Sequence, residues 1–289
     1  MKKHSSAKIN PAVRAVLTAL SLALLFLPAC SPQNPKAAGE DTSPPAQAYS
    51  VLGNTAALPA QNGADYPPDH PAQNPAGPNF PEELYQTSNS CFKLELRAPF
   101  TGNELIDEQI GSWEEALRND AARSFTKACA ARSGSVRSNY GEPDYSLEVT
   151  HETSSTPGGV ISVLFLPSTY TGGAHPVTEV VTMNFHSQTG QKLAYSDIFA
   201  DTRGLLSFLS AHARKVFRPT LGAFWDANPD MAEGLEAEPE NLSSFVLNPQ
   251  GLVLIFPPYQ IAPYSEGIQS CLVPLDLLLR FKPKPGIWN

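Results

Sequence analysis

The chain has 289 residues, 42% of them hydrophobic, and a formal net charge of −8. This length can bury a substantial core, and the acidic balance argues against nucleic acid and anionic lipid as partners. The first predicted element is an uncharged apolar run from Ala15 to Leu27 behind a basic start. As a helix at ~1.5 Å per residue it would span ~20 Å, short of the ~30 Å that a bilayer requires. We therefore interpret it as the core of an export signal.

The apolar run ends in Leu27-Pro28-Ala29-Cys30. This stretch resembles the lipobox of bacterial lipoproteins, in which a cysteine is lipidated and becomes the mature N-terminus. We predict a signal peptide over residues 1–29 and lipidation of Cys30; an ordinary cleaved signal is the alternative. Because Ser31 rather than Asp follows, the resemblance implies the periplasmic face of the outer membrane. Removing the four positive charges of the signal changes the net charge from −8 to −12, which favours cationic partners.

Residues 30–85 are rich in Pro, Ala, Gln, Asn and Gly. Such a composition cannot bury enough apolar surface to offset the loss of chain entropy, so we predict a disordered tether.

A strand follows, because residues 91–100 alternate between apolar and charged side chains. Apolar residues then recur at helical spacing and predict one long amphipathic helix from Leu105 to Cys129. We assign this strand and helix to a small lobe over residues 86–140.

From residue 141 to 282 we predict a second domain that consists mainly of strands. The expected elements are strands at 145–152 and 159–168, a strand with a return around Thr189-Gly190, a helix from Arg203 to Phe217, a solvated acidic loop from Asp226 to Glu240, a hairpin turning at Asn248–Gly251, and a last strand and short helix ending near Phe281. This order predicts an α+β fold: a mostly antiparallel sheet with a long N-terminal amphipathic helix and further helices packed on it.

Two stretches in this order, YTGGAHPVTEVVTMNFHSQTGQKLAYSDIF and FVLNPQGLVLIFPPYQIAPYSEGIQSCLVPLDLLL, carry a resemblance to a known family. They resemble the C-terminal domain shared by the lysozyme-sensing anti-sigma factor RsiV and the peptidoglycan deacetylase PdaC. Cys91 to Ala130 is similar to the smaller domain that precedes it there. The resemblance implies an extracytoplasmic module that in one member binds lysozyme. We recognise neither an anti-sigma segment nor a deacetylase catalytic domain.

The Gly-Gly-Ala-His stretch after Tyr170 raises the question of what His175 does. Three roles are considered for His175: part of a hydrogen-bonded turn, a ligand contact, and a catalytic base or metal ligand. Glu179 would lie ~13 Å away along a strand, too far to orient a base. No metal-ligand spacing, nucleophile elbow, P-loop or dinucleotide motif occurs. We therefore expect no metal, no cofactor and no catalytic residue.

The stretch FPPYQIAPYSEG, residues 256–267, has the stronger claim to contact a partner. Its prolines cannot donate to a sheet, so we predict a stiff loop that presents Tyr259 and Tyr264. By resemblance to the lysozyme-binding member, Pro257 and Tyr259 are expected to contact the ligand; Tyr264 has a buried structural role as its alternative. The predicted ligand-binding residues are Tyr170, His175, Pro257, Tyr259 and Tyr264.

These features predict a membrane-tethered, non-enzymatic binding module of the cell envelope. Its expected ligand is a lysozyme-like protein or peptidoglycan. The alternative is an envelope glycan hydrolase or deacetylase, or an accessory domain of one; a structural lipoprotein is the third choice.

Three cysteines remain after lipidation of Cys30, in a compartment where disulfides persist. We predict a disulfide between Cys91 and Cys129. A strand of ~26 Å followed by a helix of ~36 Å brings the helix end back to the strand start. Cys271 is expected to be a buried free thiol. A Cys91–Cys271 bond and three reduced thiols are the alternatives.

Overall fold

The computed structural model describes residues 78–131 and 143–289, all within one compact unit, Ala48–Asn289. The predicted signal peptide, Cys30 and most of the predicted tether lie outside the described residues. Within the described ranges, no helix is long and apolar enough to cross a membrane.

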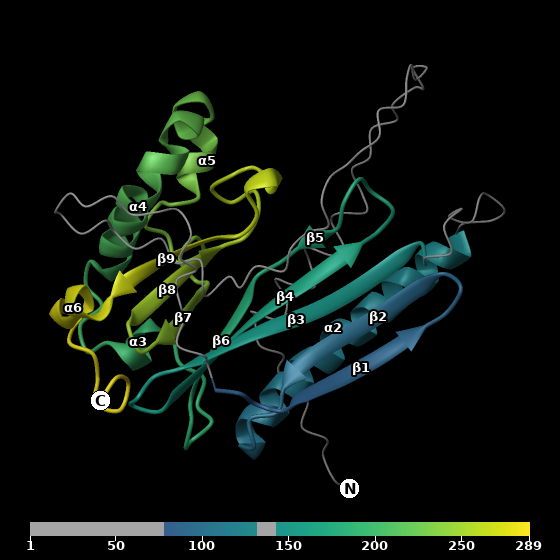
Figure 1. Cartoon of the computed structure of the whole chain (residues 1–289), viewed down its shortest axis with the longest axis horizontal. Coiled ribbons are helices and arrows are strands. Elements are labelled where there is room, and N and C mark those ends of the chain that lie inside the picture. Colours follow the sequence, from purple (N-terminus) through teal and green to yellow (C-terminus); the bar gives the residue numbers. More distant parts are fainter. Residues whose placement is uncertain (1–77, 132–142) are drawn as a thin grey trace, which may run out of the picture. The chain divides into compact units, whose positions relative to one another are not determined.

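The larger sheet, here called sheet A, has six strands (Figure 1). Its path runs β1-β2-β3-β4-β5, and β6 also pairs with β4. The β2–β3 pair is parallel, and the other pairs are antiparallel. The predicted α+β class with a mostly antiparallel sheet is therefore confirmed. The strands are β1 (Glu82–Ser88), β2 (Phe92–Pro99), β3 (Tyr145–Ser155), β4 (Val160–Tyr170), β5 (Val177–Thr178) and β6 (Val181–His186).

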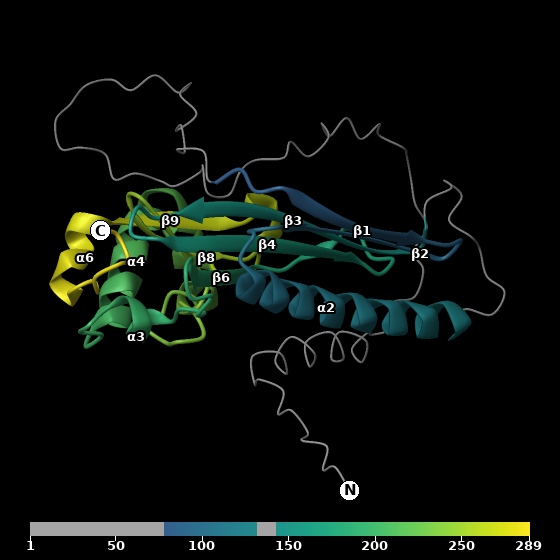
Figure 2. The ribbon, with the colours of Figure 1, turned by 90° about the horizontal axis from the view of Figure 1, so that it is seen from below.

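Helix α2 (Glu104–Ala131) covers one face of sheet A (Figure 2). It supplies the crossover that a parallel pair requires between β2 and β3. The strands on either side of the predicted lobe boundary at 140/141 thus pair directly in one sheet, although the boundary itself lies outside the described residues. The apolar interface contains Ile106, Ile110, Ala121 and Phe125 from α2, and Leu94, Leu96, Leu147 and Val149 from the sheet.

The predicted disulfide between Cys91 and Cys129 is present, with its Cα atoms 6.3 Å apart. Cys91 immediately precedes β2 and Cys129 lies in the last turn of α2, so the helix end does return to the strand start. Cys271 is a buried free cysteine, also as expected.

Strand β1 was not expected from the sequence. It begins at Glu82, inside the stretch predicted as a tether, and is exposed at every position except Tyr85, which is half-buried. Within β1 only Tyr85 packs against the core, so apolar and polar residues do not alternate along the strand and periodicity gives no signal.

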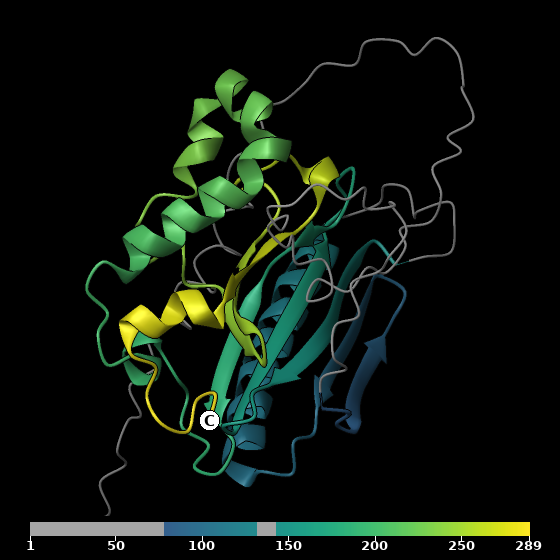
Figure 3. The ribbon, with the colours of Figure 1, turned by 60° about the vertical axis from the view of Figure 1, so that its left-hand side comes forward.

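The smaller sheet, sheet C, has three antiparallel strands in the order β7-β8-β9. Helix α4 (Leu205–Ala227) packs against it (Figure 3). The predicted hairpin at Asn248–Gly251 and the final strand and short helix are confirmed. The remaining elements are β7 (Phe245–Asn248), β8 (Gly251–Phe256), β9 (Gln269–Pro274), α3 (Tyr195–Ile198), α5 (Pro229–Glu233), α6 (Leu275–Leu278), and the 3-10 turns η1 (Tyr264–Glu266) and η2 (Leu279–Phe281).

Three local predictions for this region were wrong. Helix α4 continues ten residues beyond Phe217, through Pro219, because Leu221 and Trp225 are buried in the core and outweigh the helix-breaking proline. The return after Thr189-Gly190 is one bridge, Phe185 to Lys192, followed by α3. The acidic stretch contains the short helix α5.

The two sheets are joined by side chains of sheet A that hydrogen-bond to the backbone of β7. This strand lies at the edge of sheet C, where unpaired N–H and C=O groups would otherwise be left without partners. Polar residues on β3, β4 and β6 satisfy them, which fixes sheet C on the face of sheet A opposite α2. The four bonds are Ser154 Oγ to the Leu247 carbonyl (2.7 Å), Leu247 N to Ser162 Oγ (3.0 Å), Asn184 Nδ2 to the Phe245 carbonyl (3.0 Å) and Phe245 N to Thr182 Oγ1 (3.3 Å).

The folded core also includes residues beyond the predicted domain end at 282. Ile287 and Trp288 are buried. The Trp288 indole donates to the carbonyl of Asn248 at 2.8 Å, and the Thr156 hydroxyl donates to the carbonyl of Ile287. The C-terminus therefore ties the β3–β4 turn to the β7–β8 turn.

Candidate functional site

Two loops, one from each sheet, bring three aromatic side chains together. His175 lies between β4 and β5, whereas Tyr259 and Tyr264 lie between β8 and β9. The rings of His175 and Tyr264 stack, with centroids 3.7 Å apart and an angle of 18° between their planes. The Tyr259 ring is 5.9 Å from that of Tyr264 and tilted by 30°. We call these three residues the aromatic loop cluster.

The hydrogen bonds of His175 define the role of each ring nitrogen. Nδ1 lies 2.8 Å from the Pro176 carbonyl, which can only accept, so Nδ1 carries the proton. Nε2 lies 3.4 Å from the Tyr259 hydroxyl oxygen, within reach of a hydrogen bond. Among the described residues no carboxylate pairs with His175. Burial raises the pKa of the Glu179 carboxyl.

The loop that carries Tyr259 is anchored to the core on one side. Ile261 and Ala262 are buried, and the Trp225 indole donates to the Ile261 carbonyl at 2.7 Å. The Gln260 amide donates to the carbonyls of Gly234 and Asn241, both at 2.9 Å. The loop is therefore rigid while its tip is exposed.

Close packing explains the glycine on the neighbouring segment. A Cβ at Gly234 would overlap the carbonyl oxygen of Gln260, so a larger residue there would push the loop away. Trp225, Gln260 and Gly234 support the cluster from distant parts of the chain. No sequence signal identified them, because their function depends on contacts that span 19 to 36 residues.

Tyr259 has two unusual properties at the tip of this loop. Its φ angle is +70°, a conformation that costs a bulky residue roughly 1–2 kcal/mol. It is also 53% exposed, although it is a large aromatic residue. Tyr264 and Pro257 are half-buried, and Tyr264 supports the stacked imidazole, close to the structural role weighed as its alternative.

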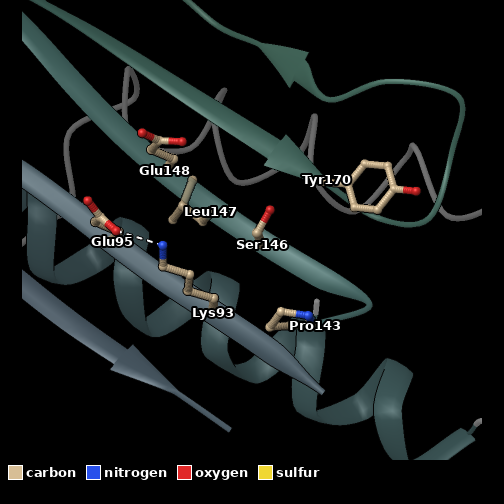
Figure 4. A pocket seen from close by; sticks show the side chains of 7 residues that line it. All are labelled: Lys93, Glu95, Pro143, Ser146, Leu147, Glu148 and Tyr170. Atoms are coloured by element: carbon tan, nitrogen blue, oxygen red, sulfur yellow. Dashed lines mark ion pairs between the residues drawn. The ribbon is translucent and has the colours of Figure 1, made fainter. Parts of the chain in front are cut away.

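Tyr170 does not join the aromatic loop cluster. It lies at the end of β4 and lines a separate pocket of about 270 Å³ on sheet A (Figure 4). We call this the polar pocket. We predicted Tyr170 and His175 as ligand-binding residues of one stretch. The glycine-containing loop between them instead places His175 against Tyr264 in a loop of sheet C, away from Tyr170. The polar pocket is lined by Lys93, Glu95, Pro143, Ser146, Leu147, Glu148 and Tyr170.

Glu95 is the most firmly held charge in the polar pocket. Lys93 Nζ and Arg97 Nη2 contact its two oxygens at 2.8 Å and 2.7 Å, and Arg97 also reaches Glu82 at 2.8 Å. The hydrogen bond from Lys93, followed by that from Arg97, lowers the pKa of Glu95. The carboxylate therefore stays ionised near neutral pH.

The described residues contain no group of three or more His, Cys, Asp or Glu side chains placed to hold a metal ion. Histidines 151 and 212 lie apart from both sites: each is at least partly buried, and burial lowers the pKa of each. The two candidate sites are thus a rigid aromatic surface and a charged, hydroxyl-lined pocket.

Comparison with known proteins identifies related sequences and structures. Residues 196–276 match a family described as a protein of unknown function, DUF3298. The peptidoglycan-N-acetylmuramic acid deacetylase PdaC of Bacillus subtilis (strain 168) is 25% identical over 187 residues, which are 65% of this chain. The chain carries a DUF3298 region that it shares with PdaC. The resemblance noted from the sequence is confirmed to that extent, and the chain spans 38% of the length of PdaC.

A matching solved structure supports a similar fold. A DUF3298 family protein from Pseudomonas aeruginosa PAO1 is 17% identical, with a TM-score of 0.50, 72% of this chain covered and 96% of that one. A DUF3298 family member from Bacteroides fragilis NCTC 9343 is 15% identical, with a TM-score of 0.48 and coverages of 72% and 95%. The DUF3298 match contains Tyr259 and Tyr264 but begins after His175.

Proposed function

We propose that this protein is a lipid-anchored, non-enzymatic binding module of the cell envelope that holds a cationic protein, such as a lysozyme, on its aromatic loop cluster. The observation that carries this proposal is the exposed ring of Tyr259 on a loop fixed by Trp225 and Gln260. A rigid aromatic side chain supplies a large contact area and loses little conformational entropy when it binds.

Charge favours a basic protein over other envelope ligands. The net charge without the predicted signal is −12, and opposite charge accelerates and orients the encounter with a cationic partner. Such steering weakens as salt is added. Tyrosine faces also attract Lys and Arg side chains, so the cluster suits the same class of partner at close range.

The envelope location rests on three observations. Residues 1–29 have the composition predicted for an export signal, and a lipobox-like stretch ends at Cys30. The fold contains the Cys91–Cys129 disulfide, which is typical of exported proteins. The chain is similar to a peptidoglycan deacetylase, which supports an extracytoplasmic place. The lipid on Cys30 and the outer membrane are parts of the proposal.

The surroundings of His175 support a binding role in preference to a catalytic one. A general base requires an oriented nitrogen within reach of its substrate, usually held by a carboxylate. Here Nδ1 bonds to a backbone carbonyl and Nε2 faces the Tyr259 hydroxyl, so both nitrogens help to shape the cluster.

The test is a calorimetric titration of the purified full chain, in mild detergent, with a lysozyme. We expect Tyr259→Ala to weaken binding by roughly 30-fold or more, as for a central aromatic anchor. Leu279→Ala is the matched control, because Leu279 is 60% exposed and lies on η2 instead of the loop. Equal affinity of the wild type and Tyr259→Ala, or no binding by the wild type, would overturn the proposal.

The same material can test the enzymatic alternative, which the likeness to PdaC motivates. The purified chain is incubated with peptidoglycan, and released sugar and acetate are measured. We expect no release above that of a heat-inactivated sample. Release that a folded His175→Ala variant abolishes would make the chain an enzyme.

A further inference from the structure

Three strands of sheet A place their polar side chains in rows on the face opposite α2. Because β2, β3 and β4 are in register, residues of successive strands lie side by side. Residues two apart on one strand point the same way and are separated by ~6.6 Å, at about 3.3 Å per residue. One row consists of Lys93, Ser146 and Tyr170, and the next of Glu95, Glu148 and Ser168.

This face is partly covered by sheet C, and the polar pocket is in the part that remains open. Further along β4, Leu164 is buried with Val246, Val253 and Ile255 of sheet C, and Leu166 packs against them. On this face of β4, Leu164 and Leu166 are followed by Ser168 and Tyr170. Sheet C covers the leucines, and the face is open at Ser168 and Tyr170. The volume of about 270 Å³ lies just below the range for drug-sized ligands, so it fits one or two sugar rings.

The side chains of the polar pocket offer both acceptors and an apolar ring. Glu148 has neither a hydrogen-bond partner nor an ion-pair partner among the described residues, whereas Glu95 is fixed by Lys93 and Arg97. Ionised carboxylates only accept, and Ser146 both donates and accepts. Figure 4 shows Glu95 and Glu148 toward one side, Ser146 beside them, and the Tyr170 ring beyond Ser146. Tyr170 therefore presents an aromatic surface next to a row of hydrogen-bonding groups.

We propose that the polar pocket binds a neutral, hydroxyl-rich saccharide of one or two rings. Vicinal hydroxyls of the sugar donate to Glu148 and Glu95, and the C–H face of the ring packs on Tyr170. This goes beyond the proposed function, because it assigns a second ligand class to a surface that contains no residue of the aromatic loop cluster.

Other ligand classes fit the polar pocket less well. Lys93 is paired with Glu95, and Glu148 adds a further negative charge, so an anion would be repelled. An apolar ligand would strip water from two carboxylates without replacing its hydrogen bonds, which is costly. A saccharide replaces that water with hydroxyl groups and also covers the tyrosine ring.

The experiment uses NMR and calorimetric titrations of the full chain with chitotriose and, separately, maltotriose. We expect at least one of the two to bind. We expect Tyr170→Ala and Glu148→Gln each to weaken that binding about tenfold or more, and Tyr170→Phe to weaken it by less than about threefold, because it retains the ring. Each variant should bind lysozyme like the wild type, which shows that it is folded and that the aromatic loop cluster is intact.

Matched variants separate this proposal from the preceding one. Tyr259→Ala should leave saccharide binding unchanged. Saccharide binding that Tyr259→Ala abolishes and Tyr170→Ala preserves would move the sugar to the aromatic loop cluster and overturn the assignment. Failure of both sugars to bind at roughly 10 mM would also overturn it, whatever lysozyme does.

Discussion

Sheet A and sheet C are each covered by one long helix, yet the two regions are held in different ways. In sheet A, α2 buries one face, the opposite face remains partly polar, and the Cys91–Cys129 disulfide closes the layer. In sheet C, every residue of β7 and β8 is buried. Sheet A is thus cross-linked and keeps part of one face open at the polar pocket, whereas β7 and β8 of sheet C are held by apolar burial.

The aromatic loop cluster requires both regions. His175 extends from a loop of sheet A, and Tyr259 and Tyr264 extend from a loop of sheet C. Their stacking therefore depends on how firmly β7 is joined to sheet A through Ser162 and its neighbours. The polar pocket, by contrast, is built from sheet A and Pro143, two residues before β3.

Removal of the disulfide should give the largest effect. For a sequence separation of 38, the loop-closure model predicts a loss of roughly 4 kcal/mol in the Cys91→Ala/Cys129→Ala variant. Urea unfolding measures the loss, and amide exchange should accelerate in α2 more than in β8. Reduction of the wild type is the control and should give a similar loss. A change below about 1 kcal/mol would show that sheet A does not depend on the cross-link.

The junction between the sheets should give an intermediate effect. Asn184 and Ser162 are buried and hydrogen-bonded to each other and to β7. Asn184→Ala leaves the Phe245 carbonyl unpaired and should cost roughly 1–3 kcal/mol, measured by urea unfolding. Ser168→Ala, on the open part of the same face of β4, is the control and should change stability by less than about 0.5 kcal/mol. Equal losses of stability in the two variants would show that residues under sheet C matter no more to stability than residues on the open part of the face.

Replacement of either of two buried histidines, one in each region, should have the smallest effect on stability. Burial is the largest cause that lowers the pKa of both His151 and His212. The unfolded chain then binds protons more readily, so stability is full above about pH 6.5 and is lost as pH falls toward and through the lowered folded pKa. The smaller causes at His151 are the charge of Glu82 and a backbone hydrogen bond with Arg97, which raise the pKa, followed by the charges of Arg97 and Glu152.

The partners of the two histidines differ, which gives the comparison. His151 Nδ1 is buried without a hydrogen-bond partner, whereas His212 Nε2 donates to the Leu272 carbonyl at 2.9 Å. We therefore expect His151→Leu to reduce the acid sensitivity with less loss of stability at pH 8 than His212→Leu. His212→Leu should reduce it too but lower stability at pH 8. Urea unfolding at pH 5 and pH 8 measures both, and an unchanged acid sensitivity in both variants would contradict the assignment.

Sheet A was largely predictable from sequence because one-sided burial makes residues alternate. The strand at 91–100 and the helix that ends at Cys129 followed from periodicity, and together they gave the disulfide. Strand β1 was missed because all its residues except Tyr85 are exposed, so they do not alternate between apolar and polar. The extension of α4 was missed because burial of Trp225 outweighs Pro219, and burial depends on distant contacts.

The candidate site was predictable in part. The prolines and tyrosines of residues 256–267 indicated a stiff aromatic loop, and His175 stood out beside its glycines. Local sequence patterns could not predict that these two stretches contact each other. His175 and Tyr264, whose rings stack, are 89 residues apart in the chain. Glu148 lies beside Glu95 because β2 and β3, which α2 connects, pair in parallel in one register. Hydrophobic periodicity does not determine that register.

The central claim is that a cationic protein binds at the aromatic loop cluster, apart from the polar pocket. Amide chemical-shift mapping of the full chain during a lysozyme titration tests it most directly. We predict shifts at His175, Tyr259 and Tyr264, and none at Lys93, Glu148 and Tyr170. Shifts centred on the polar pocket, or no shifts at saturating lysozyme, would contradict the claim.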